Sequence, residues 1–595
     1  MRLFFDLILL LTLLLLVSCS QASSGAPDGN GNGDFEPPSD SGEDAEEIKF
    51  SEIVYSRPDP SALLSHISDI CDRIKNGHKF DTVKTNMASA SRELDNFLTM
   101  HSYALIRVSI DTADSEFKEE YGILSDRLPE VRRAVDELYH LAIASSEADR
   151  YESEIFGAGY FSSARNREYS ERVVSLLKEE AEAEARYSAL STDNVRFSYD
   201  GHTMTYREAE KYLAAKYGKD AAKYEKALAD CKSKHDKEYA DAAADIFVEL
   251  LSVRRLIANE LGYKSYAEYA YLSEGRSYLP SDAKGFIADV SRYAVPVYSE
   301  LSSNILSPYL KNHDPKKVTV KETVNGLYGL YCENAPMLAD LFDWMMKRSL
   351  YDVRHGSVNR YDGAFTVYLD ECEAPFIFMS ASGVPTDLFT LSHEFGRFAR
   401  LSAIGGEDIS PDLAEIYSEG LEFLTLAMLE DDLFDVDYKY VLYYRIAETF
   451  ETLLTQSFYS SVELAAYELE YDEISREALD VIVADAAASM GLGAKSLSDI
   501  ASRQLLLSPT LAQSYATALI PAAELLFMEL ENDGAGVSVY LSMLSEEGSE
   551  GEVLSKAGLP SPLDKDAVRK LADRIYFLIN GSHYYSEADK LGNAA

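Results

Sequence analysis

From residue 50 to the C-terminal region, apolar residues recur at spacings of three and four, with few clusters of turn-forming residues between them. Residues 131–138 and 242–251 show the pattern clearly, each with apolar side chains on one helical face. This periodicity is typical of amphipathic α-helices. The chain has 595 residues, of which 46% are hydrophobic, so it can bury several large cores. We therefore predict a mainly α-helical protein of more than one domain.

Few segments have the character of strands. Residues 195–199 and 203–205 flank a turn at Gly201, and residues 364–369 are followed by the apolar run 375–379. Both pairs are expected to form strands, because alternating or continuous apolar runs bounded by turn residues favour sheet.

Two helices are predicted directly after the second pair of strands. Residues 383–387 supply a turn and a helix start, and Ser410-Pro411-Asp412 has the order of an N-cap, a first-turn proline and an acidic first turn. The second helix carries Glu415, Ser418, Glu419 and Glu422.

The first of these helices contains a near-match to a metal-binding motif, His393-Glu394-Phe395-Gly396-Arg397. In the intact motif H-E-x-x-H, two histidines on one helical face hold Zn²⁺ and the glutamate deprotonates the metal-bound water. Here Arg397 stands where the second histidine belongs. A guanidinium offers no lone pair and stays protonated, so it cannot replace the ligand. Arg397 could instead pair with Glu394 and Glu415 in the position of the metal.

The ordered set of segments resembles the oligoendopeptidase F and thimet-type family of zinc metallopeptidases. The resemblance rests on residues 257–266, 374–378, 387–396, on Glu415-Ile416-Tyr417-Ser418 with Glu422, and on Tyr515-Ala516-Thr517. It implies a two-lobed helical metallopeptidase-like fold with a deep channel between the lobes and a small β-sheet beside the motif helix.

The resemblance also assigns roles to individual residues. It implies that His393 is the first metal ligand, Glu394 the general base and Glu415 the third ligand, with Ser418 and Glu422 supporting them. Tyr515 is a candidate contact to the substrate or its oxyanion. The family's histidine and tyrosines before Y-A-T are replaced, read without gaps, by residues that cannot donate in the same way: Leu505, Leu507, Ser508, Leu511 and Gln513.

Two remaining ligands are fewer than the three that a catalytic zinc site uses, so we expect zinc to be absent or weakly bound. Whether the chain is an enzyme stays open at this point. His355, expected in a loop before residues 361–365, is the alternative ligand from elsewhere in the chain. Peptide binding could outlast hydrolysis if Ala374, Phe376 and Phe378 lie on an edge strand, because an extended peptide can add to a free sheet edge.

The N-terminus predicts a location. An apolar core at residues 7–16 is too short to span a bilayer, and Leu16-Val17-Ser18-Cys19 resembles a bacterial lipobox. Cys19 is therefore the expected lipidation site, which would place the protein outside the cytoplasm in the bacterial cell envelope. The predicted domains are a signal peptide (1–18), a flexible acidic, Gly- and Ser-rich tether (19–48), a helical domain (49–195) and a peptidase-like domain (196–595).

The net charge of −44 disfavours nucleic acid, whose phosphates would be repelled, and leaves peptides and the membrane as expected partners. Three functions remain open. The first is a lipid-anchored peptidase homologue that binds extended peptides with zinc-dependent hydrolysis lost or much reduced. The second is an active metalloendopeptidase with an altered metal site, and the third is a non-enzymatic interaction or structural lipoprotein.

Overall fold

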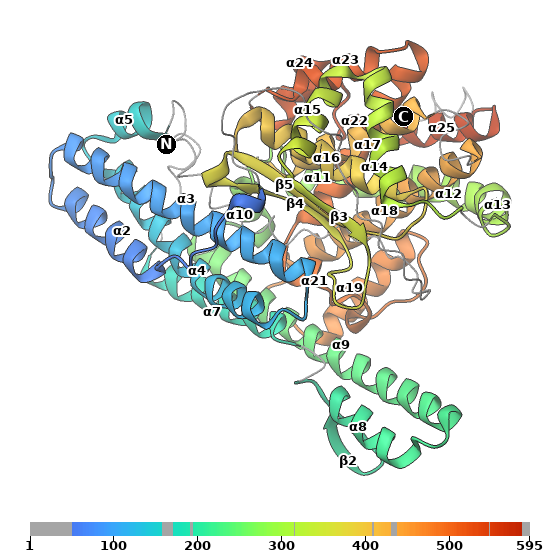
Figure 1. Cartoon of the computed structure of the whole chain (residues 1–595), viewed down its shortest axis with the longest axis horizontal. Coiled ribbons are helices and arrows are strands. Elements are labelled where there is room, and N and C mark those ends of the chain that lie inside the picture. The colour runs from blue at the N-terminus through green and yellow to red at the C-terminus, as the bar shows by residue number, and fades with distance from the viewer. Residues whose placement is uncertain are drawn as a thin grey trace.

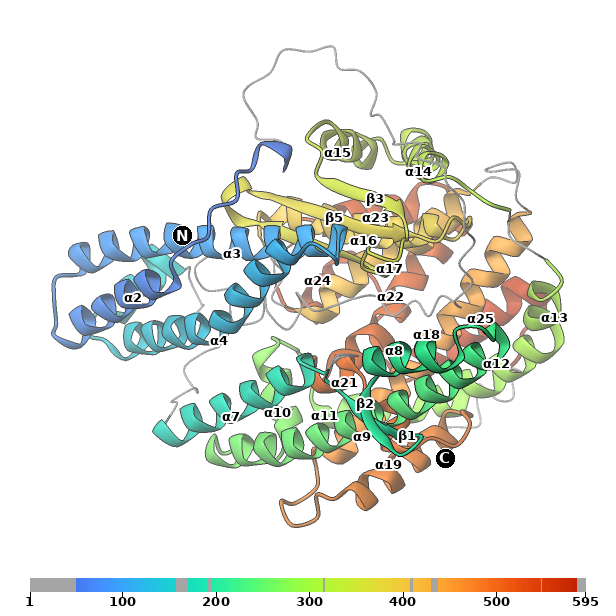
Figure 2. The same ribbon diagram turned by 60° about the horizontal axis from the view of Figure 1, so that its bottom comes forward.

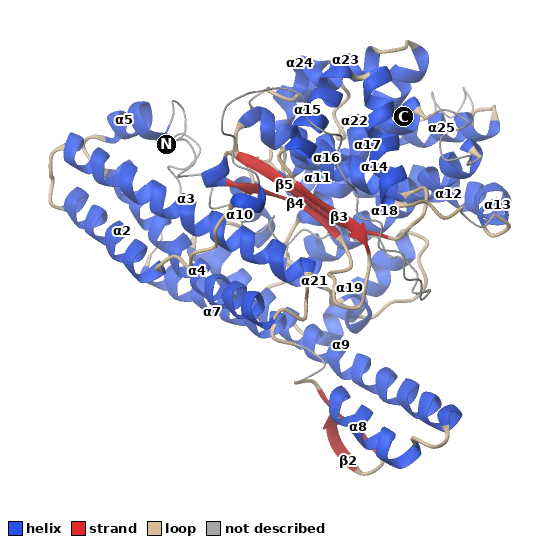
Figure 3. Cartoon of the chain, in the orientation of Figure 1, coloured by secondary structure: helices blue, strands red, loops and turns tan. Residues whose placement is uncertain are grey.

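The computed structural model describes residues 50–156, 170–190, 194–313, 316–406, 410–429, 437–546 and 548–585. Most of these residues are helical, and the strands among them form two small sheets (Figure 3). The predicted mainly α-helical fold is therefore confirmed. The predicted signal peptide, Cys19 and the tether lie outside the described residues.

An N-terminal bundle has a core of its own, in which Ile67, Leu94 and Val131 are fully buried. Two helices of the bundle have aspartate N-caps: Asp59 and Asp114 each accept hydrogen bonds from backbone N–H groups of the first helical turn that follows. The elements of the bundle are η2 (Phe50–Glu52), α2 (Pro60–Lys75), α3 (Phe80–Ile110), α4 (Ser115–Ala144), α5 (Ala148–Tyr151) and η3 (Glu152–Phe156).

A projecting arm follows the bundle (Figure 1). It is formed by β1 (Arg196–Tyr199), β2 (His202–Thr205), α8 (Tyr206–Tyr217) and the first half of α9 (Ala221–Glu260). The predicted hairpin is confirmed, with Tyr199 opposite His202 and Gly201 at φ +79° in the turn. The second half of α9 packs on α7 (Glu171–Ser188) and shares its core. The boundary predicted at residue 195 stays a prediction, and the core groups α7 with α9 across it.

The remaining elements lie in two tiers in Figure 2, and each tier has its own hydrophobic core. One core is built mainly from α7, α9, α10 (Tyr266–Ser273), α11 (Pro280–Asp289), η4 (Val290–Ala294), α12 (Val295–Leu301), η5 (Ser302–Leu306), α13 (Ser307–Leu310), α18 (Tyr438–Ala466), α19 (Arg476–Ser489), α20 (Leu497–Ile500), α21 (Arg503–Leu507) and α25 (Ala567–Asn580). The other is built mainly from α14 (Val320–Asn334), α15 (Pro336–Lys347), the three-stranded sheet, α23 (Ala535–Met543) and α24 (Glu550–Ala557). The channel expected between the lobes stays a prediction.

Three helices contribute to both cores: α16 (Asp387–Ile404), α17 (Pro411–Met428) and α22 (Leu511–Glu531). The helix starts predicted for α16 and α17 are confirmed. Asp387 accepts hydrogen bonds from the backbone N–H groups of Ser382, Gly383 and Val384, and Ser410 caps α17. α22 is also long and apolar enough to cross a membrane, but 83% of its apolar window is buried inside the fold, as in a core helix.

The three-stranded sheet has the order β3-β5-β4, so β5 (Ala374–Ala381) is its central strand. β3 (Tyr351–His355) pairs with β5 in parallel, and β4 (Ala364–Leu369) pairs with it antiparallel; η6 (Asp370–Cys372) joins β4 to β5. The prediction that Ala374, Phe376 and Phe378 lie on an edge strand is therefore wrong. Phe376 and Phe378 are buried against Ile106 of α3. A continuous apolar run is what a strand with both faces covered requires, and the edge strands among the described residues are β3 and β4.

Strand β3 of this sheet was not predicted from the sequence. His355 does not lie in a loop but ends β3, with its ring next to Gly383 at the start of α16. The sequence of β3, Tyr-Asp-Val-Arg-His, is too charged and polar to predict a strand. The strand is stabilised instead by its pairing with β5 and by a buried ion pair between Asp352 and Arg360.

The close approach of α16 and α17 depends on one glycine. A Cβ added at Gly396 would lie 2.5 Å from the carbonyl oxygen of Tyr417 and 3.0 Å from the Cα of Ser418. These are backbone atoms, so the clash can be relieved only by moving the helices apart. The spacing of the residues on α16 and α17 that face each other therefore requires glycine here.

We expect Gly396→Ala to destabilise the protein by about 2 kcal/mol or more, as overpacking of a tight core does. The matched control is Gly122→Ala in α4, where an added Cβ has no neighbour within 4 Å and the helix should gain up to about 1 kcal/mol. Urea unfolding followed by circular dichroism measures both. Equal stability of the two variants would contradict the close helix contact.

A buried polar network joins α18, α22 and the α10–α11 connection at Thr510, a non-glycine residue with φ +68°. Glu463 accepts a hydrogen bond from the backbone N–H of Thr510 (2.9 Å), Glu274 accepts one from its hydroxyl (2.7 Å), and Arg276 donates to its carbonyl (3.0 Å). Burial raises the pKa of Glu463 to about 8 and that of Glu274 to about 7. Both carboxyl groups therefore take up protons when the chain folds near neutral pH.

The raised pKa of Glu463 predicts that stability falls as the pH rises from about 4.5 to about 8, since the folded state holds a proton that the unfolded state has lost. The slope from this group is at most about 1.4 kcal/mol per pH unit. We expect Glu463→Gln to flatten the decline, measured by urea unfolding at a series of pH values. Glu260→Gln, at an exposed position of α9, should leave the slope unchanged. An identical decline in both variants would refute the assignment.

Candidate functional site

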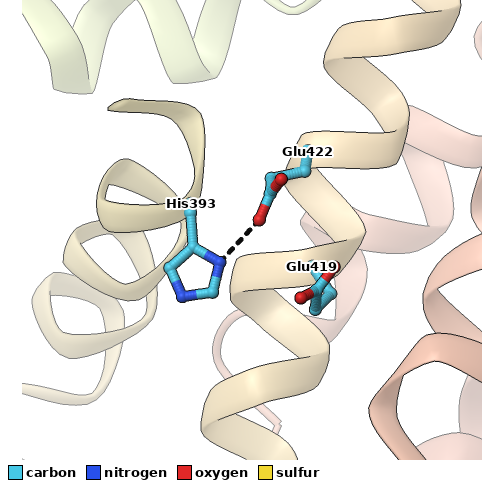
Figure 4. A group of neighbouring side chains, drawn as sticks. All are labelled: His393, Glu419 and Glu422. Atoms are coloured by element: carbon cyan, nitrogen blue, oxygen red, sulfur yellow. Dashed lines mark hydrogen bonds and ion pairs between the residues drawn. The ribbon is translucent and has the colours of Figure 1, made fainter. Parts of the chain in front are cut away.

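The near-motif lies on α16 beside α17, where His393 meets glutamates of the second helix. α16 presents His393, Glu394 and Arg397, and α17 presents Glu415, Glu419 and Glu422 at spacings of four and three. These spacings place the three glutamates on neighbouring positions of one helical face. Figure 4 shows the imidazole of His393 on α16 directed at the carboxylates of α17. Ser418 lies on the same helix, where α17 meets Gly396.

His393 is held by a hydrogen bond at one ring nitrogen and has a second carboxylate near the other. Its Nδ1 lies 2.6 Å from Oε1 of Glu422, and its Nε2 lies 3.8 Å from Oε2 of Glu415. The side chain is 16% exposed, while both carboxylates are nearly buried. The Glu415 Oε2 atom is buried and has no hydrogen-bond partner, so the charge on the ring faces it directly.

Glu394 points to the sheet rather than to α17. The hydroxyl of Thr366 on β4 donates to its carboxylate oxygen Oε2 (2.7 Å) and also contacts its carbonyl oxygen (3.0 Å). Glu394 is buried, which raises its pKa, whereas the charges of His393 and Arg397 act to lower it. The edge strand β4 therefore runs past the residue that the resemblance assigns as general base.

A second arginine enters the site from α18. Arg445 is 2% exposed, and its Nη2 atom lies 2.5 Å from Glu419 and 3.1 Å from Glu422. Its Nη1 atom lies 3.1 Å from Glu448, also on α18. Each of these glutamates thus has a buried cation beside it.

The charge states follow from this arrangement. Burial by itself would lower the pKa of His393, but the hydrogen bond to Glu422 and the charges of Glu415 and Glu394 raise it to about 10. His393 is therefore an imidazolium at neutral pH, with Nδ1 donating to Glu422 and Nε2 facing Glu415 without a hydrogen bond. Burial raises the pKa of Glu415 to about 7, opposed by the positive charges of His393 and Arg397.

These residues do not fit a catalytic zinc ion. Such a site takes three protein ligands and a water, and here the converging donors at the motif are His393 Nε2 and Glu415 Oε2. Arg397 cannot coordinate, and its positive charge acts on Glu394 and Glu415. The one group of three possible ligands found among the described residues is His393, Glu419 and Glu422, with ligand atoms within 4.8 Å of one another. Arg445 already pairs with two of these three.

Other residues that the sequence singled out lie elsewhere. His355 is not in that group, so no described contact supports it as a replacement ligand. Tyr515 lies on α22, partly exposed. The positions where the resemblance expects a histidine and tyrosines are buried; Gln513, for example, accepts a hydrogen bond from Ser460 (2.6 Å).

Sequence reasoning missed three residues of the site, Thr366, Arg445 and Glu448, and it missed the part played by Glu419. Glu419 stands four residues after Glu415 and could have been found from the helical period. Thr366 and Arg445 come from other elements, and no local pattern links them to the motif.

Comparison with known proteins agrees with this fold. Residues 50–170 match the family model of the Peptidase M3 N-terminal domain. A protein from Bacillus anthracis str. Ames described as an oligoendopeptidase F has a TM-score of 0.69 and 21% identity over 92% of this chain and 100% of its own. PZ peptidase A, solved with an inhibitor, has a TM-score of 0.71 and 20% identity over 90% and 99%. No curated protein matches the sequence.

These findings confirm the predicted resemblance to the oligoendopeptidase F type of M3 peptidase, in the N-terminal domain and in the fold of the described chain. M3 peptidases are generally zinc-dependent. The roles assigned to His393, Glu394, Glu415 and Tyr515 stay predictions.

Arg397→His should complete a three-ligand set with His393 and Glu415. We expect Zn²⁺ affinity to rise roughly 100-fold, since the 10–16 kcal/mol of a four-ligand site amounts to about 3 kcal/mol per ligand. Equilibrium dialysis with metal analysis measures the change. Arg397→Met, which removes the charge without adding a ligand, is the control; an equal gain in both variants would show that charge alone excludes the metal.

Proposed function

We propose that this chain is a lipid-anchored protein of the oligoendopeptidase F type that binds extended peptides and has lost most or all zinc-dependent hydrolysis. The observation that carries the proposal is the buried set of ion pairs at the motif. His393 donates to Glu422 and faces Glu415, and Arg397 stands at the place of the second histidine. Without three ligands, no metal-bound hydroxide can be generated there.

Peptide binding is proposed at β4. β5 pairs with one edge of β4, and no described strand pairs with its other edge. An extended peptide added to that edge would lie next to Thr366 and Glu394, which are in contact. All six residues of β4 are buried, in contact with α16 and α3, so the proposal requires these neighbouring elements to move when a peptide enters.

The location is proposed from the sequence. The short apolar segment at residues 7–16 and Cys19 support acylation at the membrane, and the tether of Ser, Gly, Asp and Pro residues that follows supports a flexible link to the folded part. The net charge of −44 argues against nucleic acid as a partner.

An active metallopeptidase with an altered site is the second candidate. It is favoured by the unpartnered Oε2 atom of Glu415, which lies 3.8 Å from His393 Nε2, so these two groups could still share a metal if a further ligand joined them. A non-enzymatic interaction protein without a peptide site is the third.

The test uses a fluorescent library of ten-residue peptides. We expect binding in the presence of EDTA and no cleavage after addition of Zn²⁺ or Mn²⁺. Metal-stimulated cleavage that Glu394→Gln abolishes would establish the active peptidase instead. Absence of binding in any condition would favour the interaction protein.

Strand addition also predicts how backbone methylation changes the affinity of the peptide of that library that binds most tightly. Methylation of alternate backbone nitrogens should weaken binding by about fivefold each, since each removes a hydrogen bond worth about 1 kcal/mol. Methylation of the intervening nitrogens should have little effect, because those groups point away from β4. A uniform effect of methylation along the peptide would contradict strand addition.

A further inference from the structure

Arg445 is enclosed on all sides. The residue is 2% exposed, and its guanidinium lies 4.8 Å from the ring centre of Phe423 and 6.0 Å from that of Phe389. These rings belong to α17 and α16, so Arg445 of α18 reaches into the contact between the two site helices. A charge in such a position is stable only when it is paired.

Besides Glu448 on its own helix, its partners are carboxylates of α17 that lie beside His393. The Nη2 atom of Arg445 contacts Oε2 of both Glu419 (2.5 Å) and Glu422 (3.1 Å). The other oxygen of Glu422 accepts the hydrogen bond from His393 Nδ1 (2.6 Å). One carboxylate thus links the imidazole to the guanidinium, and three residues of the cluster depend on the same cation.

These contacts involve the group that could otherwise hold a metal. His393, Glu419 and Glu422 have ligand atoms within 4.8 Å of one another, which is close enough to share an ion. Two acidic side chains buried together repel each other unless a cation lies between or beside them, and burial raises the pKa of Glu419 in this cluster. Arg445 supplies a fixed positive charge there.

We propose that Arg445 takes the place of a divalent cation: it pairs with both Glu419 and Glu422 and, through Glu422, fixes the imidazole of His393. The inference rests on the metal-free centre of the proposed function and adds a residue that neither the motif nor the resemblance contains. Arg445 is a positioning residue, since it acts on His393 through Glu422. Removing it should expose a latent metal site made of His393, Glu419 and Glu422.

The experiment compares the thermal unfolding of the full chain and of Arg445→Met in EDTA, Zn²⁺ and Mn²⁺. We expect the variant to unfold at a temperature at least about 5 °C lower in EDTA, because loss of one partner leaves buried charges unpaired. Zn²⁺ or Mn²⁺ should restore at least half of that loss in the variant and bind at one ion per chain. Neither ion should raise the unfolding temperature of the unaltered chain.

Arg254→Met is the matched control. Arg254 is 0% exposed and pairs with Glu180 (2.7 Å) and Glu184 (3.2 Å), and no histidine of the described chain is among its hydrogen-bond or ion-pair partners. Its loss should lower the unfolding temperature in the same way, but metal should not restore it. Equal rescue of both variants would show non-specific binding to acidic residues and would overturn the proposal.

If Arg445→Met does not fold, Arg445→Met combined with Glu419→Gln keeps the test open. This pair removes one charge of each sign, so we expect folded protein to be recovered; failure to recover it would overturn the proposal. A stoichiometric zinc ion in the unaltered chain would overturn it too. The readouts are unfolding temperature and metal content, so a failure here is distinct from a failure of peptide binding, which is measured separately in EDTA.

Discussion

The fold places at least five charged or protonatable side chains between α16, α17 and α18, and their mutual pairing is the constraint on which the site depends. Glu415, Glu419 and Glu422 are each no more than 6% exposed, and none could stay ionised there alone. Buried carboxylates of this kind need a cation beside them, either a metal ion or a charged side chain. Here the imidazolium of His393 and the guanidinium of Arg445 supply it through direct contacts, and Arg397 adds its charge at Glu415.

The packing of the molecule serves this arrangement. Gly396 lets α16 approach α17 closely enough for His393 to reach Glu422, and α22 lies against α17 and α18 as a buried apolar helix. On the other side of α16, Thr366 of β4 holds Glu394. The general-base position and the ion-pair cluster are thus contacted by different elements: β4 holds Glu394, and α18 pairs with Glu419 and Glu422.

Much of this could be predicted from the sequence. Apolar periodicity gave the helices, and the cap at Ser410 and the turn before Asp387 gave the two site helices, because these signals are local. The order of the strands could not be predicted in this way. The run at residues 375–379 is apolar on both faces, so it could form either an edge strand or a central strand until its partner β3 is known. The charged residues Asp352 and Arg354 hide β3 from a search for apolar strand patterns. Arg445 follows Glu422 by more than twenty residues, and no rule of spacing links two helices across such a distance.

The central claim is that fixed side-chain charges, and no metal ion, hold this centre together. The most direct measurement is the zinc content of the full chain, purified without chelator and then titrated with Zn²⁺ in a calorimeter. The account predicts far less than one zinc per chain on isolation and no binding tighter than about 10 μM, since a site with two available ligands forfeits about half of the binding free energy of a four-ligand site. One tightly held zinc per chain, lost together with Glu415→Ala or His393→Ala, would contradict it.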